Sequence, residues 1–330
     1  MAERAPLVGT DAAPVPEGAT AEWFSGAGGA RLRAALFPAG GRALGSVVVS
    51  PGRTEAIEKY FEVAAALKTR GFAVLVHDWR GQGLADRLLP DRLLGHASGY
   101  ADFLADYAAL IAAFETRLPR PWLALGHSMG GCLTLLALAE GEERFAAAIL
   151  SAPMLGVRTG AVPRPVARFL AGLLTRLGRG RLAVPGSAGL SIPFEANIVT
   201  RDRVRYERNE GLLAAYPDLA LGLPTWGWLD FAFAATDRLA RGPGVARTAI
   251  PVTVVAAGED VLVDNDALRA VTARLPRGRY LEIPGARHEI LQETDAVQGP
   301  FWSAFDDLAS VANLGLGSPP DSVVTGGAAH

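Results

Sequence analysis

Residues 123–133 read LALGHSMGGCL, two apolar segments joined through a serine that stands among glycines. The central pentapeptide, residues 126–130, has the pattern G-x-S-x-G around Ser128. The preceding run WLALG is typical of a buried strand, and the segment from Met129 onward is typical of a helix. The stretch therefore predicts a sharp turn from a strand into a helix, with Ser128 at its tip.

Glycine is required on both sides of a serine in such a turn. Side chains at Gly126 and Gly130 would collide with neighbouring backbone, and glycine removes the collision. The turn, which includes His127, lifts the Ser128 hydroxyl above the carboxyl ends of the strands. The amide of Met129 then points to where a substrate oxyanion would form. A glycine-rich turn with an incidental serine is the competing interpretation of the pentapeptide alone.

A serine nucleophile needs a histidine to take its proton and an acid to orient that histidine. In enzymes with this turn, the acid and then the histidine follow the serine along the chain. Asp260 follows the strand-like run VTVVAAG, and His288 follows RYLEI, so both are expected at the sheet edge that displays Ser128. Glu259 and Asp264 are alternative acids, and Asp260 is favoured because it lies closest to the end of its strand. His288 remains after elimination of the other four histidines.

The loop SPGRTEAIEKY directly follows the strand-like run SVVVS and is the candidate for a second oxyanion donor. Gly52 lets the backbone turn tightly, which makes the amide of Arg53 the candidate group. An ordinary Pro-Gly turn is the alternative, and the spacing alone does not decide between the two.

Short β-rich runs alternate with helical patterns, which predicts an α/β fold with a mostly parallel central sheet flanked by helices. The alternation covers residues 21–153 and 248–315, the expected core. Residues 154–247 lack clear strands and are expected to form a helical cap, inserted after the sixth strand. Residues 1–20 and 316–330 are rich in Gly, Pro and Ala and are predicted to be flexible ends.

Composition excludes several classes of function. The 330-residue chain has a formal net charge of -2, which gives no case for binding nucleic acid. Its single cysteine, Cys132, cannot form an internal disulfide, and Cys/His spacings typical of a metal site are absent. No secretory signal or stretch of transmembrane length is evident. We expect a soluble, cytoplasmic protein that uses neither a metal nor an organic cofactor.

The expected cap carries an apolar stripe at helical spacing, with Arg168 and Thr175 on the opposite side. The stripe consists of Val166, Phe169, Leu170, Leu173, Leu174 and Leu177. Residues 154–194 contain six arginines and no acid. This pattern suits peripheral contact with the inner membrane face, or a lid that admits an acyl chain; a helix packed on the main domain with solvated arginines is the alternative and the commoner case for such a helix.

A second, aromatic cluster in the expected cap could line an acyl tunnel or form a small core of the cap itself. The cluster consists of Trp226, Trp228, Phe231 and Phe233. We favour the core.

Five motifs, in this order, resemble the monoacylglycerol lipase and bacterial lysophospholipase branch of the α/β-hydrolases: VVSPGRTEAIEKY, HDWRGQGLADR, GHSMGG, AGEDVLVDN and GARHEIL. The resemblance covers roughly residues 20–315 and implies a serine carboxylic-ester hydrolase that acts on small single-chain acyl esters. It implies a nucleophile, an acid, a base and two oxyanion amides at Ser128, Asp260, His288, Arg53 and Met129.

The chain departs from this family at Pro51-Gly52, where monoacylglycerol lipases usually have His-Gly. The stretch DWRGQG, residues 78–83, is shared with the branch and is assigned to the structure of a loop.

Two rival functions stay open. One is hydrolysis of small soluble esters or thioesters with the same triad, because a fold does not define the leaving group. The other is a catalytically silent scaffold that binds a ligand.

Overall fold

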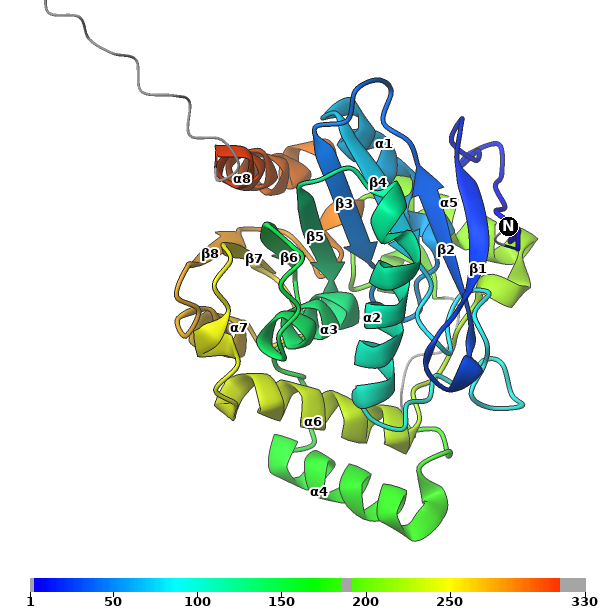
Figure 1. Ribbon diagram of the computed structural model, residues 1–330. Helices are drawn as coiled ribbons and strands as arrows, with labels where there is room; N and C mark the ends of the chain where they lie inside the picture. Colours follow the sequence, from blue (N-terminus) through cyan, green and yellow to red (C-terminus); the bar gives the residue numbers. More distant parts are fainter. Residues whose placement is uncertain (1–2, 186–191, 315–330) are drawn as a thin grey trace, which may run out of the picture.

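A central eight-stranded sheet organises the computed structural model, which describes residues 3–185 and 192–314 (Figure 1). The strand order is β1-β2-β4-β3-β5-β6-β7-β8; β2 runs antiparallel to β1 and β4, and the other neighbours are parallel. The strands are β1 (Thr20–Ser25), β2 (Arg31–Phe37), β3 (Gly45–Ser50), β4 (Phe72–His77), β5 (Trp122–His127), β6 (Ala147–Ser151), β7 (Val252–Ala257) and β8 (Gly278–Ile283). The prediction of a mostly parallel sheet is confirmed.

Helices cover both faces of the sheet, and three more lie between β6 and β7, where the cap was expected (Figure 1). The α-helices are α1 (Phe61–Thr69), α2 (Ala101–Phe114), α3 (Ser128–Ala139), α4 (Arg164–Leu174), α5 (Arg203–Ala215), α6 (Trp226–Arg241), α7 (Asn265–Thr272) and α8 (Asp295–Leu314). Side chains of α1 and α8 pack on one face, and those of α2, α3 and α7 pack on the other. The fold is the expected α/β architecture with a helical insertion after the sixth strand.

The central strands β3 to β7 are buried along their whole length. Helices on both faces explain why their sequences are nearly continuous apolar runs without alternation. In the parallel part of the sheet, Ser50 pairs with Gly126, and His127 pairs with Ser151. The carboxyl ends of β3, β5 and β6 therefore lie level at one edge, where their following loops can meet.

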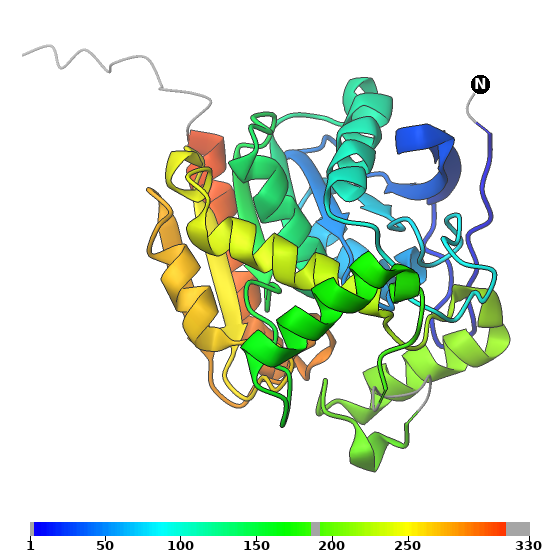
Figure 2. The ribbon, with the colours of Figure 1, turned by 90° about the horizontal axis from the view of Figure 1, so that it is seen from below.

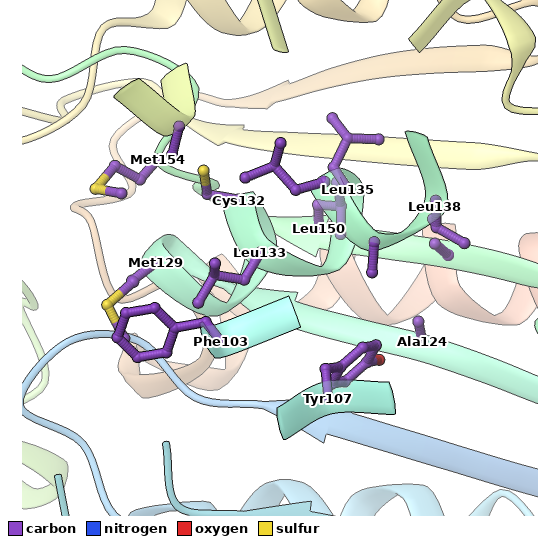
Figure 3. Close-up of a cluster of buried hydrophobic side chains, with 14 of the residues drawn as sticks. Phe103, Tyr107, Ala124, Met129, Cys132, Leu133, Leu135, Leu138, Leu150 and Met154 are labelled. Atoms are coloured by element: carbon purple, nitrogen blue, oxygen red, sulfur yellow. The ribbon is translucent and has the colours of Figure 1, made fainter. Parts of the chain in front are cut away.

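Helix α3 runs through the largest apolar cluster, and the side chains from Met129 to Leu138 are buried. Figure 3 shows Met129 beside Phe103 of α2, with Leu133 on the same helix. Cys132 lies within this cluster and is fully buried, which raises the pKa of its thiol far above its ordinary value. The helix that carries Ser128 is thus anchored on all sides.

The cap is built in layers on the helical core (Figures 1 and 2). Phe231 of α6 packs against Phe103 of α2, with ring centroids 5.1 Å apart. Helix α4 lies on the outer side of α6 and contacts it through Ala167, Ala171 and Phe233. Phe231 and Phe233 are therefore packing residues, as favoured for the aromatic cluster. None of the helices in the described residues is both long and apolar enough to cross a membrane.

The N-terminal segment differs from the expected flexible end. Residues 3–5 pair with the edge strand β1, where the Ala5 amide donates to the Ala21 carbonyl over 2.9 Å. The Arg33 guanidinium also donates to the Pro6 carbonyl over 2.9 Å. The prediction from composition missed these contacts, because backbone hydrogen bonds to an open sheet edge need no particular side chains. The predicted flexible tail, residues 316–330, lies outside the described residues.

A buried ion network joins β2 to the loops that follow β3 and β4. Arg33 contacts Glu58 over 2.7 Å and Asp78 over 2.8 Å, and all three side chains have 0% exposure. Asp78 also accepts a hydrogen bond from the Ile57 amide over 3.0 Å. Two carboxylates buried together need this single guanidinium, because an unpaired buried charge is strongly unfavourable.

We therefore expect Arg33→Leu to lower the free energy of unfolding by about 3 to 5 kcal/mol, since it leaves two buried carboxylates without a partner. The matched control is Arg31→Leu on the same strand, where an exposed arginine pairs with Glu3. That change should cost less than about 1 kcal/mol. Urea denaturation of both variants measures the difference, and equal losses would contradict the role given to Arg33.

Candidate active site

Ser128 occupies a strained turn between β5 and α3. Its φ angle is +49°, in the left-handed region that non-glycine residues seldom adopt, while the residue stays partly exposed. A Cβ atom at Gly130 would lie 2.1 Å from the Ser50 carbonyl oxygen, and one at Gly126 would lie 2.7 Å from the Gly131 Cα. Both glycines are therefore required by close backbone approach, as the sequence predicts.

The three segments that carry Ser128, His288 and Asp260 converge at the carboxyl edge of the sheet. The His288 Nε2 atom lies 2.9 Å from the Ser128 Oγ, and its Nδ1 lies 2.7 Å from an Asp260 carboxylate oxygen. His288 and Asp260 are each 5% exposed. A hydroxyl, an imidazole and a carboxylate thus form one continuous hydrogen-bonded line that opens to solvent at the serine.

Asp260 is held in its charged form. Burial alone would raise the pKa of this carboxyl, but the hydrogen bond and charge of His288 and the amides of Val263 and Leu262 outweigh it and lower the pKa. The two amides donate to the other carboxylate oxygen over 3.0 and 2.8 Å. The ionised carboxylate can accept a hydrogen bond from the N–H at His288 Nδ1, and in that tautomer Nε2 is the acceptor that faces the Ser128 hydroxyl.

The two alternative acids lie elsewhere. Asp264 is the N-cap of α7, where its side chain accepts from the Asp266 amide over 3.1 Å. Glu259 forms an ion pair with Arg201 at the protein surface. Of the three candidates, the structure brings Asp260 to His288.

The two candidate oxyanion amides belong to the first turn of α3 and to the loop after β3. The Met129 amide is in the first turn of α3, where helix N–H groups have no intrahelical acceptor. The loop after β3 holds the Arg53 amide in place from both sides: the Gly52 carbonyl accepts from the Gln82 side chain over 2.9 Å, and the Thr54 amide donates back to Gln82 over 3.2 Å. Within the described residues, the Arg53 amide has no acceptor.

Sequence analysis missed Glu55, which braces this loop. Its carboxylate accepts from the Gly52 amide, from the Tyr60 hydroxyl over 2.5 Å and from Lys59 over 2.9 Å. Burial works against its charge, but the charge of Lys59 and the hydrogen bond from Tyr60 outweigh it and lower its pKa to about 2. The only signal in the sequence is that Lys59 is one of two lysines in the chain, and its spacing does not indicate a partner.

The His127 ring belongs to the supports of the turn. Its Nδ1 atom lies 3.1 Å from the Ser151 carbonyl oxygen, and its Nε2 lies 3.7 Å from Glu55. Burial lowers its pKa, because desolvation disfavours the charged imidazole. His127 thus remains a neutral packing group beside the line of Ser128 and His288.

The DWRGQG stretch has the structural role expected of it. Asp78 holds the loops after β3 and β4, and Arg80 forms a bidentate pair with Asp106 of α2 over 2.5 and 2.6 Å. Gln82 from this stretch holds the loop of Arg53, as described above. In residues 3–185 and 192–314, no group of three or more His, Cys, Asp or Glu side chains comes together in a way that could hold a metal ion.

Comparison with known proteins yields consistent matches. Residues 41–295 match the family model described as serine aminopeptidase, S33. The chain is 34% identical over 284 residues to lysophospholipase L2 of Escherichia coli K12, which covers 82% of each chain. It is 27% identical over 273 residues to the monoacylglycerol lipase of Mycolicibacterium smegmatis, covering 82% of this chain and 91% of that one.

Among solved structures, a soluble variant of monoglyceride lipase from Saccharomyces cerevisiae has a TM-score of 0.72. The alignment covers 93% of this chain and 98% of that chain at 20% identity, a likeness that concerns the fold. By its sequence match over residues 41–295 and its identity to lysophospholipase L2, the chain belongs to the α/β-hydrolase superfamily, in the branch of bacterial lysophospholipases and monoacylglycerol lipases.

Proposed function

We propose that the protein hydrolyses the ester bond of single-chain acyl lipids, lysophospholipids or monoacylglycerols, with Ser128 as nucleophile, His288 as base and Asp260 as the orienting acid. The observation that carries the proposal is the hydrogen-bonded line through these three side chains at 2.9 and 2.7 Å. The named relatives support the coarser statement, a lipid ester hydrolase of the α/β-hydrolase superfamily.

The first half of the reaction acylates the serine. His288 Nε2 takes the hydroxyl proton while the Ser128 Oγ attacks the ester carbonyl, and the charge that develops on the carbonyl oxygen is held by the amides of Arg53 and Met129. Asp260 stabilises the imidazolium without taking its proton. When the tetrahedral intermediate collapses, the C–O bond to the alcohol breaks, and His288 gives the proton to the leaving alcohol.

The second half repeats these steps with water. His288 accepts a proton from a water molecule as its oxygen attacks the acyl-enzyme carbonyl, and the same two amides hold the oxyanion. The Ser128 Oγ then leaves with a proton from His288, and the fatty acid is released. Every proton moves between Ser128, His288, the leaving alcohol and the attacking water.

The cap supplies a surface suited to a lipid interface. The apolar stripe of α4 is turned away from the protein: Phe169 is 66% exposed, and Leu177 just after the helix is 64% exposed. The helix packs on α6 through its alanines, and Phe169 and Leu177 lie outside that contact. Of the flanking arginines, Arg168 pairs with Asp237 of α6 over 2.7 Å.

We therefore propose that the exposed side chains of this stripe, which include Val166 and Leu173, rest on the membrane surface while the enzyme takes lipid from it. Apolar side chains on the outermost cap helix can enter the interface between head groups and acyl chains. This contact is peripheral, at the cytoplasmic face.

Ser128→Ala is expected to lower ester turnover by at least about 10⁴-fold, because no other group in the line can form the acyl-enzyme. Labelling by a fluorophosphonate probe should disappear at the same time, while circular dichroism and thermal unfolding stay close to wild type. Retention of most of the turnover would exclude Ser128 as the nucleophile.

Asp260→Asn is expected to lower kcat by about 10⁴-fold, because an amide no longer stabilises the imidazolium or the required His288 tautomer. The matched control is Asp264→Asn, four residues away. Asparagine caps a helix as well as aspartate does, so this variant should keep kcat within about threefold of wild type. Steady-state kinetics on one soluble ester measures kcat for both variants. A larger loss in Asp264→Asn than in Asp260→Asn would show that the assignment of Asp260 as the acid is wrong.

The double change Phe169→Ser, Leu177→Ser tests the cap surface. Each side chain contributes about 1.5 to 3 kcal/mol when fully buried, so partial insertion of both predicts at least a tenfold loss in binding to phospholipid vesicles. Val204→Ser, which changes a residue of α5 that is 75% exposed, is the control. Hydrolysis of a short soluble ester should stay the same in all three proteins. Equal vesicle binding by all three would contradict the membrane role.

A further inference from the structure

The Arg53 side chain is a buried cation with one protein acceptor. The residue as a whole is partly exposed, but its Nε atom is closed off from solvent and has no partner among the described residues. One terminal nitrogen, Nη2, donates to the Gly222 carbonyl. The guanidinium carbon also lies 5.1 Å from the centre of the Trp228 ring. The guanidinium therefore has unpaired donors, one of them buried, among the described residues.

No carboxylate balances this charge. Among the ion pairs of the described residues none involves Arg53, whereas the fully buried Arg33 lies between Glu58 and Asp78. Burial alone lowers the pKa of Arg53 to about 10, so the group stays protonated at neutral pH. A buried charge without a counter-ion is unfavourable unless an anion completes it.

This cation lies next to the proposed reaction centre. The amide of the same residue is the candidate oxyanion donor, so the guanidinium lies within the length of its own side chain from that amide. Its neighbours Gly95 and Trp228 line a small gap. Met129, the residue that follows the serine, also lines this gap. In a lysophospholipid, the phosphate is separated from the ester carbonyl by the short glycerol unit, a span that an arginine side chain can match.

We infer that the Arg53 guanidinium binds the phosphate of the substrate's head group. The inference rests on the proposed function and narrows it, because it makes lysophospholipids better substrates than monoacylglycerols. The planar fork of arginine can donate two parallel hydrogen bonds to two phosphate oxygens, and such charge-assisted bonds are strong at a site shielded from water. Trp228 holds the guanidinium plane in position for them.

A purely structural role must be separated from phosphate binding, because Arg53 also bridges the core loop to the cap. Arg87 offers the matched comparison. It too bridges a core loop to the cap, with donations to the carbonyls of Gly83 over 2.9 Å and Ala220 over 3.1 Å. Its loss should impair cap attachment without removing a group near the ester.

The test compares kcat/KM for 1-lauroyl-lysophosphatidylglycerol and 1-lauroylglycerol in the same mixed micelles. Wild type should prefer the phosphate-containing lipid. In Arg53→Gln the ratio of the two kcat/KM values should fall about 10- to 100-fold, the worth of a charge-assisted hydrogen bond. Arg87→Gln should lower both values by the same factor. Equal losses on both lipids in Arg53→Gln, or a wild type without preference, would overturn the inference.

Arg53→Lys is a second variant that keeps the test decisive if Arg53→Gln folds poorly. Lysine keeps the charge but lacks the fork, so the ratio should fall by less than in Arg53→Gln. Glycerol 3-phosphate should inhibit hydrolysis of a short soluble ester, at least tenfold more weakly in both Arg53 variants. If inorganic phosphate inhibits equally well, the group binds free phosphate and the head-group assignment is wrong.

The outcome also separates this inference from the proposed function. Suppose that wild type hydrolyses both lipids and that this activity depends on Ser128, but that substitution of Arg53 leaves the ratio of the two kcat/KM values unchanged. The triad proposal then stands, and the head-group assignment fails. If wild type cleaves short soluble esters but neither lipid, both proposals fail.

Discussion

The backbone of α3 approaches the loop after β3 so closely that no side chain fits between them. At Gly130 a single added carbon would lie 2.1 Å from the carbonyl oxygen of Ser50 and 2.3 Å from that of Pro51. This contact brings the start of one helix and the end of another strand into fixed register. The strained φ of Ser128 is maintained by the packing of the whole helix.

Buried charges hold the loops that this approach brings together. Glu55 fastens the loop of the oxyanion candidate from within, and Asp78 fastens its continuation to the loop after β4. The carboxylates are matched by Lys59 and Arg33, so their burial does not leave charge uncompensated. Arg53 departs from this rule, since its guanidinium is enclosed without an acid. The loops of the site are therefore held by paired charges, while the Arg53 guanidinium has no carboxylate partner among the described residues.

The sequence predicted those features that local chemistry determines. The turn at Ser128 follows from glycine spacing at a strand end, and the positions of Asp260 and His288 follow from the rule that parallel strands end at one edge. The helical cap follows from the missing strand pattern between β6 and β7. Each of these depends on residues that are close in sequence or on the topology of the sheet.

Features that depend on contacts between distant segments were not predictable. The brace from Glu55 needs Gly52, Tyr60 and Lys59 to meet in three dimensions, and no periodicity marks such a cluster. The apolar stripe of α4 has the same spacing whether it faces inward or outward; the alanines on the other side decide. The N-terminal segment was taken as flexible because its pairing uses backbone groups, which composition does not record.

The burial of Cys132 has a practical consequence for measuring how the cap moves. This chain's one native sulfhydryl belongs to α3 and lies inside the apolar cluster, protonated and without solvent access. Cysteines introduced at exposed positions of α4 and α8 would therefore be the groups that react with a maleimide dye. A pair of such dyes would report the distance between cap and core by energy transfer, with no need to remove the natural thiol.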